Sequence, residues 1–163
     1  MISQTVSQLD ITKILARYIS KPYALGDIDK GYDCLNLFYY FYKTIGVAFP
    51  EEFEGVTIKN YVQAWKSGNG RNIFDRFLMT LGIPINENYM RRGDLLLFHG
   101  DQNTVFCAIY SGNNSVVMNF ETGCKVVSYR YLKRFLIGVR RFRELFTEKE
   151  LEEMEELNKV DVE

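Results

Sequence analysis

The hydrophobic periodicity of the chain changes once, near Gly93-Asp94, and this change limits the possible folds more than any other feature. Before it, apolar residues recur at the three- and four-residue spacing of amphipathic helices. After it, short apolar runs alternate with turn signals such as Gly112-Asn113-Asn114, a pattern typical of antiparallel strands. A block of helices followed by a block of strands predicts an α+β domain, with N-terminal helices packed on a C-terminal antiparallel sheet.

Local signals give approximate limits for each element. Apolar residues at helical spacing predict helices at Ile11–Ile19, Asp33–Ile45, Lys59–Trp65 and Ile73–Leu81. Short apolar runs bounded by turn residues predict strands at Leu95–His99, Val105–Tyr110, Ser115–Phe120, Lys125–Ser128 and Phe135–Phe142. Because the strands follow one another through short turns, an antiparallel meander is expected.

A length of 163 residues suits one domain of ordinary size. Residues 1–143 are expected to form this domain, and residues 144–163 a charged C-terminal helix or tail. Thr147 can cap a helix that runs through Leu157, with Leu151 and Met154 on one side. Because this segment is rich in Glu, a solvated or frayed terminal helix is favoured over a helix that docks on a partner.

Charge and hydropathy exclude several functional classes. A formal net charge of -1 gives no basis for electrostatic binding of nucleic acid or of an anionic membrane. No stretch approaches the roughly 18 apolar residues of a membrane span, so membrane insertion is not expected. The first ten residues lack the basic cluster and apolar run of a signal peptide. By its own sequence the protein is expected to be synthesised in the cytoplasm and to stay there.

The three cysteines, Cys34, Cys107 and Cys124, are widely spaced and include no metal-type pair such as Cys-x-x-Cys. Free thiols are expected, with no metal and no cofactor. Cys34 follows Asp33, a good N-cap residue, and therefore falls in the first turn of a helix. There the helix dipole and the free backbone N–H groups favour the thiolate and can also stabilise an oxyanion. A small buried side chain is the other reading of such a cysteine.

Several motifs then follow in an order and spacing that resemble the NlpC-type cell-wall cysteine peptidases, which have a papain-like fold. These motifs are Pro22-Tyr23, Gly31-Tyr32-Asp33-Cys34, Gly46-Val47 to Pro50, Gly93-Asp94-Leu95-Leu96-Leu97-Phe98 and Ala108-Ile109-Tyr110. The match runs from about Tyr18 to Phe142. The resemblance implies a papain-like domain with Cys34 in the nucleophile position and Tyr23 in the cleft.

The segment Asp33-Cys34-Leu35-Asn36-Leu37 is most similar to the family versions encoded in phage tail gene clusters. That resemblance implies a virion component whose partners are other phage tail-tip proteins. It has one departure, because the glycine that the family usually has two places after the cysteine is Asn36 here.

The chain departs from the family pattern at the catalytic base. Phe106 occupies the position of the family histidine, and a phenylalanine side chain cannot transfer a proton. Met118 has the register of the polar third member, with Asn119 one step away as a possible substitute. Losing a positioned general base costs about 10²–10⁴-fold in rate. The only histidine, His99, is expected across the sheet from about Thr104, where a surface histidine is favoured over a relocated base.

Three functional readings remain open. The favoured one is a degenerate NlpC-type domain, a pseudoenzyme that serves as a structural or binding component of a phage tail tip. The alternative is an active cysteine amidase or peptidase that cleaves peptidoglycan stem peptides with Cys34 as nucleophile and His99 as base. A host protein that uses the fold to bind an amide-containing ligand is the third.

Overall fold

The computed structural model describes residues 8–26, 29–68 and 70–162. Its α-helices are α1 (Gln8–Ala16), α2 (Cys34–Thr44), α3 (Tyr61–Lys66), α4 (Gly70–Thr80) and α5 (Glu148–Val162). Its strands are β1 (Glu52–Phe53), β2 (Val56–Thr57), β3 (Ile83–Ile85), β4 (Leu95–His99), β5 (Val105–Gly112), β6 (Ser115–Phe120), β7 (Gly123–Ser128) and β8 (Leu136–Arg141). The predicted α+β architecture is confirmed, and β4 and β6 have the predicted limits.

The main sheet has the strand order β3-β8-β4-β5-β6-β7, and neighbouring strands are antiparallel. The expected meander is therefore wrong at one point, because β8 returns to pair with β4. Strand β4 is buried on both faces, so the backbone groups on both of its edges need partners within the sheet. Strand β3 was not predicted. It contains Pro84 and lies at the edge of the sheet, where a missing backbone donor is tolerated.

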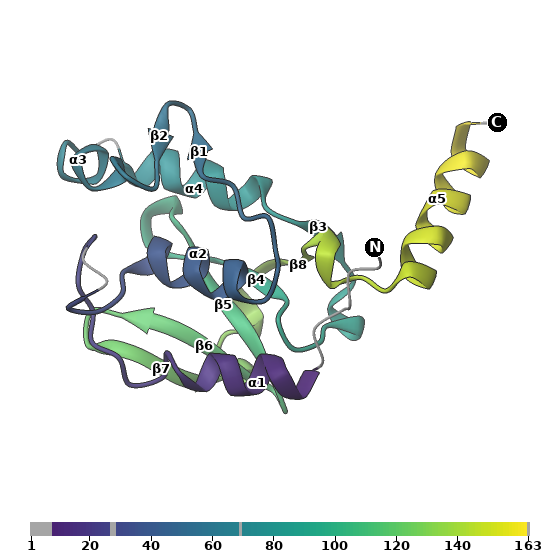
Figure 1. Cartoon of the computed structure of the whole chain (residues 1–163), viewed down its shortest axis with the longest axis horizontal. Coiled ribbons are helices and arrows are strands. Elements are labelled where there is room, and N and C mark those ends of the chain that lie inside the picture. Colours follow the sequence, from purple (N-terminus) through teal and green to yellow (C-terminus); the bar gives the residue numbers. More distant parts are fainter. Residues whose placement is uncertain (1–7, 27–28, 69, 163) are drawn as a thin grey trace.

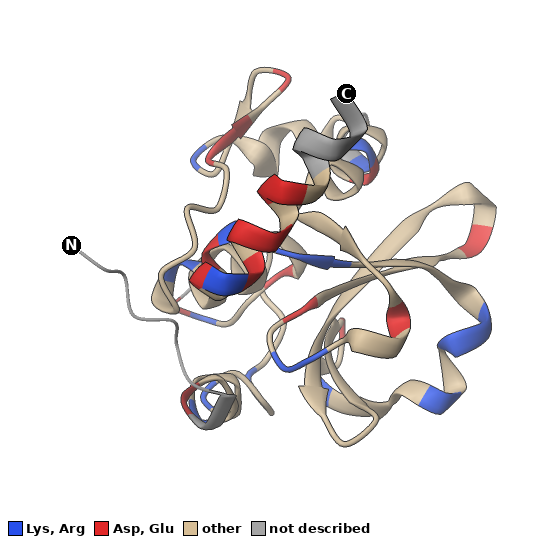
Figure 2. Cartoon of the chain, turned by 90° about the vertical axis from the view of Figure 1, so that its right-hand side faces the viewer, with Lys and Arg blue, Asp and Glu red and all other residues tan. Residues whose placement is uncertain are grey.

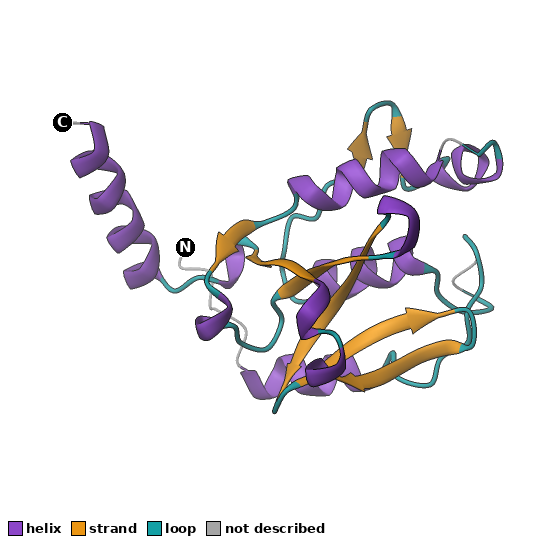
Figure 3. Cartoon of the chain, turned by 180° about the vertical axis from the view of Figure 1, so that it is seen from behind, coloured by secondary structure: helices purple, strands orange, loops and turns teal. Residues whose placement is uncertain are grey.

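Helices α1 and α2 cover one face of the sheet (Figure 1). Helix α2 buries Leu37, Phe41 and Tyr42, which share a core cluster with residues of β4 and β5. The Tyr42 hydroxyl donates to the carbonyl of Gly93 at 2.8 Å, so its polar group is satisfied inside the core. The other face is covered by short 3-10 turns between β7 and β8, including buried Tyr129 (Figure 3).

Helices α3 and α4 and the two-stranded hairpin β1–β2 lie on the side of α2 that is away from α1 (Figure 1). The hairpin strands have two residues each, which is too short for a periodic signal, and they were not predicted. Helix α4 contacts β5, which places it beside the N-terminus of α2. This arrangement forms the surroundings of Cys34.

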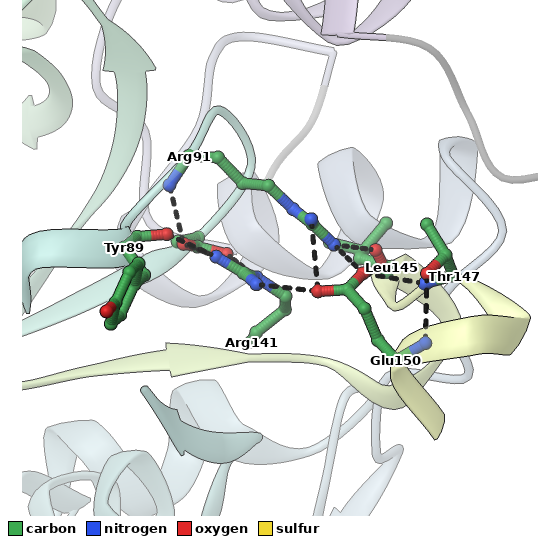
Figure 4. A network of polar contacts seen from close by, with 7 residues as sticks. Tyr89, Arg91, Arg141, Leu145, Thr147 and Glu150 are labelled. Atoms are coloured by element: carbon green, nitrogen blue, oxygen red, sulfur yellow. Dashed lines mark hydrogen bonds and ion pairs between the residues drawn. The ribbon is translucent and has the colours of Figure 1, made fainter. Parts of the chain in front are cut away.

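The C-terminal segment is helical, and α5 projects from the body of the domain with acidic residues along it (Figures 1 and 2). Its first turn is anchored rather than frayed. Glu150 forms ion pairs with Arg91 at 2.9 Å and with Arg141 at 3.7 Å, and Arg141 forms a buried bidentate pair with Asp94 at 2.8 Å (Figure 4). None of the described helices is long and apolar enough to cross a membrane.

Candidate functional site

Cys34 is the first residue of α2, as predicted, and local hydrogen bonds fix this helix start. One carboxylate oxygen of Asp33 accepts the N–H groups of Leu35 at 2.9 Å and Asn36 at 2.8 Å. The Asn36 side-chain oxygen accepts the N–H of Asp33 at 2.7 Å, which completes a capping box. Asn36, the departure from the family glycine, therefore serves the helix terminus.

The second oxygen of Asp33 joins two distant segments to this helix start. It accepts the N–H of Gly26 at 2.7 Å and a short hydrogen bond from the Tyr61 hydroxyl on α3. Burial, followed by this hydrogen bond to Asp33, raises the pKa of the Tyr61 hydroxyl, which stays protonated as the donor. The Asp33 carboxylate is thus fully engaged as a hydrogen-bond acceptor and is not free to act as a general base on Cys34.

Cys34 lines two cavities. The smaller has a volume of about 70 Å³ and lies between the start of α2, the β1–β2 hairpin and helices α3 and α4. Tyr23, predicted for the cleft, lines it beside Cys34 and Asp33. Burial, and then the nearby Cys34 and Asp33, raise the pKa of the Tyr23 hydroxyl. Tyr23 also forms an isolated backbone bridge with Tyr32, which holds the loop before α2 in place.

The larger cavity has a volume of about 340 Å³, and it brings Cys34 together with Phe106, Met118 and Asn119. Its lining residues are Cys34, Phe38, Arg71, Phe74, Val105, Phe106, Cys107, Met118, Asn119, Phe120, Val127 and Leu132. The residues that the sequence analysis assigned to the nucleophile, base and third-member positions therefore line one cavity. Most of its wall is apolar.

This cavity lies where β5 and β6 separate. Paired residues of these strands run from Ile109 opposite Val117 to Gly112 opposite Ser115. Among the described pairs, the part of β5 before Ile109 has no partner on β6, although it pairs with β4. At this gap, side chains from the start of β5 and the end of β6 line the cavity. Cys34, at the N-terminus of α2, lines the same cavity.

The Cys34 thiol lies in surroundings that oppose ionisation. Burial raises the pKa of this thiol to about 11, the Asp33 carboxylate adds to the increase, and the Arg71 guanidinium opposes it without overcoming it. The thiolate-favouring effect expected at a helix N-terminus is therefore outweighed. The Cys34 thiol donates a hydrogen bond to the backbone carbonyl of Asn119, with 3.9 Å between the sulfur and the oxygen.

Phe106 and Met118, which line the larger cavity together with Cys34, provide no proton acceptor. Phe106 stacks on Phe98 with ring centroids 5.1 Å apart, and Met118 is buried. Asn119 donates from Nδ2 to the Tyr32 carbonyl at 2.7 Å, while its Oδ1 is buried without a hydrogen-bond partner among the described residues. Asn119 is therefore present in the site, but as an amide that contacts backbone.

His99 is the exposed last residue of β4 and pairs with Val105 rather than with Thr104. The register differs from the expectation because Gly100 donates to the Thr104 carbonyl at 2.8 Å, which places both residues in the turn. His99 lines neither of the two cavities that contain Cys34. A relocated base at this residue stays a prediction that no described contact supports.

Arg71 belongs to the site but was not identified from the sequence. It lies in the first turn of α4, where Nη2 donates to the Val105 carbonyl at 2.8 Å and Nε lies 3.2 Å from Asp75. Its guanidinium lies 6.0 Å from the centre of the Trp65 ring. No local motif surrounds Arg71, because its role arises only when α4 packs beside β5. Within the described residues, no three potential metal ligands gather.

Comparison with known proteins agrees with this fold. The sequence matches the profile of the NlpC/P60 family over residues 20–141. A search among curated proteins returned no match. An NlpC/P60 family protein from Bacillus cereus ATCC 10987 superposes with a TM-score of 0.60 at 18% identity, over 85% of this chain and 41% of that protein. NlpC1 from Trichomonas vaginalis gives 0.59 at 16% identity, over 87% and 46% of the two chains.

The NlpC/p60 domain of the peptidoglycan hydrolase SagA gives a TM-score of 0.55 at 20% identity, with 84% of this chain and 100% of that domain covered. This chain therefore corresponds to a whole domain of one relative but to less than half of the Bacillus cereus and Trichomonas vaginalis proteins. The family match covers more than half of the sequence, and the fold agrees with it, so this chain belongs to the NlpC/P60 family.

Proposed function

We propose that this NlpC/P60 domain binds a peptide of the cell-wall type in the Cys34 cleft and is a degenerate member that does not hydrolyse it efficiently. The observation that carries the proposal is the lining of the larger cavity, where Cys34 has Phe106 and Met118 around it and no side chain that can accept its proton. With a thiol pKa of about 11, only a very small fraction of Cys34 is thiolate at neutral pH.

The ligand class follows from the family and from the cleft. One structural relative is a peptidoglycan hydrolase by name, which makes a peptide the reasonable ligand for a preserved cleft. The smaller cavity has aromatic walls that include Tyr23, Trp65 and Phe74, and these walls offer apolar contact to one group of a bound peptide. A fold can keep its binding surface after the catalytic groups have changed.

The alternative is an active cysteine amidase or peptidase that cleaves peptidoglycan stem peptides with Cys34 as nucleophile. It requires a general base within hydrogen-bond reach of the sulfur, directly or through water. His99 does not line the cavities, and both oxygens of Asp33 are already engaged. No described contact favours this alternative.

Two measurements on the purified protein test the proposal. Soluble muropeptides should bind in a calorimetric titration, and their hydrolysis, followed by liquid chromatography, should be at least about 10²-fold slower than by the SagA domain under the same conditions. Cys34→Ala should leave any residual turnover unchanged. Rapid turnover that disappears in Cys34→Ala would contradict the proposal and support the alternative. Failure of any muropeptide to bind would also contradict it.

A role as a phage tail-tip component is a further part of this proposal. It rests on the similarity of Asp33-Cys34-Leu35-Asn36-Leu37 to family versions from phage tail gene clusters. Antibodies raised against the purified chain should label the tail tips of phage particles released from the source strain. Labelling that is absent from intact particles, while the protein is detected in the cell extract, would argue for a host protein instead.

A further inference from the structure

The larger cavity next to Cys34 has the size of a small-molecule site. Its volume of about 340 Å³ lies within the range of roughly 300–1,000 Å³ that is common for ligand pockets. Phe38, Phe74, Phe106 and Met118 supply much of its wall, and Phe120 lies at its exposed side. The replacement of family polar groups by Phe106 and Met118 thus leaves an apolar chamber where a hydrolase would have its proton-transfer groups.

Among the described residues that line this cavity, only Arg71 carries a charge. Nη2 of the guanidinium donates to the Val105 carbonyl, whereas Nε lies 3.2 Å from Asp75 without forming a hydrogen bond to a described residue. Asp75 offsets part of the charge, but it does not line the cavity. A guanidinium has five N–H donors, so these two contacts do not exhaust it. Its field reaches the cavity, since it opposes the increase in the pKa of both Cys34 and Cys107.

Asn119 supplies the second polar group. Its Nδ2 is committed to the Tyr32 carbonyl at 2.7 Å, which fixes the orientation of the amide. Its Oδ1 is buried and has no hydrogen-bond partner among the described residues. Because this oxygen is enclosed by neighbouring atoms, the amide adds polarity beside the cavity but offers no acceptor to a ligand. The cavity therefore presents one cation, Arg71, and an apolar chamber.

We propose that this cavity binds the C-terminal residue of a peptide, or an N-acyl amino acid, that has a bulky apolar side chain. The free carboxylate pairs with Arg71, and the apolar side chain fills the chamber beside Phe106. This inference rests on the proposed peptide-binding function and specifies which end and which residue type of the peptide enter the site.

The matched probes are N-acetylphenylalanine, its C-terminal amide and N-acetylglycine, with both enantiomers of the first two. Calorimetric titration of the unmodified protein should show binding of N-acetylphenylalanine. The amide should bind at least about tenfold more weakly, because it lacks the charge that Arg71 recognises. N-acetylglycine should also bind at least about tenfold more weakly, because it leaves the chamber empty.

Arg71→Gln should remove the preference for the acid over the amide. Arg76→Gln, on the same helix, should retain that preference, because Arg76 is exposed and pairs with Glu54 at 2.8 Å outside the cavity. Equal binding of the acid and the amide by the unmodified protein would overturn the inference, whether or not the variants fold. Muropeptide binding without any binding of N-acetylphenylalanine would overturn this inference alone. Absence of muropeptide binding would instead contradict the proposed function.

Discussion

The Cys34 thiol combines the location of a nucleophile with the chemistry of a buried side chain. The helix N-terminus and Arg71 favour the thiolate, whereas burial and the Asp33 carboxylate favour the thiol. The second pair of effects dominates, and the pKa of the thiol rises to about 11. No side chain that lines the larger cavity can take the proton from Cys34, so we expect the thiol to be unreactive.

Alkylation of Cys34 should therefore be slow at neutral pH. A free cysteine has a pKa of about 8.5, so a thiol with a pKa near 11 should react with iodoacetamide about 10²-fold more slowly at pH 7. The rate should still increase about tenfold per pH unit between pH 8 and 10, where a free thiol levels off. Peptide mass spectrometry separates Cys34 from Cys107 and Cys124. A plateau in the Cys34 rate below pH 9 would contradict the assignment.

Phe106→His should partly restore a reactive thiol. The new imidazole would stand on the wall of the cavity that Cys34 also lines, and an imidazolium there lowers the pKa of the thiol. The Cys34 alkylation profile should therefore shift to lower pH. Loss of the ring contact with Phe98 should cost about 0.5–1.5 kcal/mol of stability.

His99→Ala is the control for that experiment. Because His99 lines neither cavity, its removal should leave the Cys34 profile unchanged. A shift with His99→Ala and none with Phe106→His would show that His99 acts on the thiol, and the domain would then have to be considered an enzyme.

Helix α2 shows which parts of an element can be predicted from sequence. Its start after Asp33 and its buried stripe come from local signals, namely a capping residue and helical spacing, and both are confirmed. The hydrogen bond from Tyr61 to Asp33 joins residues 28 positions apart, and no local pattern indicates such a contact. The same limit applies to Arg71, whose position depends on the packing of α4 beside β5.

Asp33→Ala should destabilise the domain through two elements. Loss of the N-cap of α2 costs about 0.5–2 kcal/mol, and leaving the Tyr61 hydroxyl and the Gly26 N–H without their acceptor adds about 1–3 kcal/mol. Tyr61→Phe removes only one hydrogen bond and should cost about 1 kcal/mol. Urea unfolding measures both. Equal losses in the two variants would mean that the cap contributes little.

At the scale of the whole molecule, the helical layer and the sheet could be predicted from the sequence, but the order of the strands in the sheet could not. The switch from helical to strand periodicity defined the two layers, because burial on one face imposes those periods. The insertion of β8 between β3 and β4 depends on long-range pairing, which a short apolar run does not encode. For the same reason, the gap between β5 and β6 that creates the larger cavity could not be foreseen from the sequence.

One polar network connects the sheet to the C-terminal helix. Arg141 on β8 pairs with the buried Asp94 before β4, and it also approaches Glu150 on α5 (Figure 4). Arg91 donates to Glu150 at 2.9 Å and to the Leu145 carbonyl at 2.7 Å. The helix that projects from the domain is therefore held at its first turn by charged groups.

The attachment of α5 to the domain should consequently depend on pH. Burial alone would raise the pKa of the Glu150 carboxyl, but the Thr147 N–H and the Arg91 guanidinium outweigh it and hold the pKa below its ordinary value of 4.5. A lowered pKa in the folded state stabilises the attachment above about pH 4.5, and this contribution is lost as the pH falls through the folded value. The Thr147 amide resonance should report the transition with a midpoint below 4.5. Arg91→Gln should raise that midpoint, Glu150→Gln should abolish the titration, and a midpoint above 4.5 in the unmodified protein would refute this anchoring.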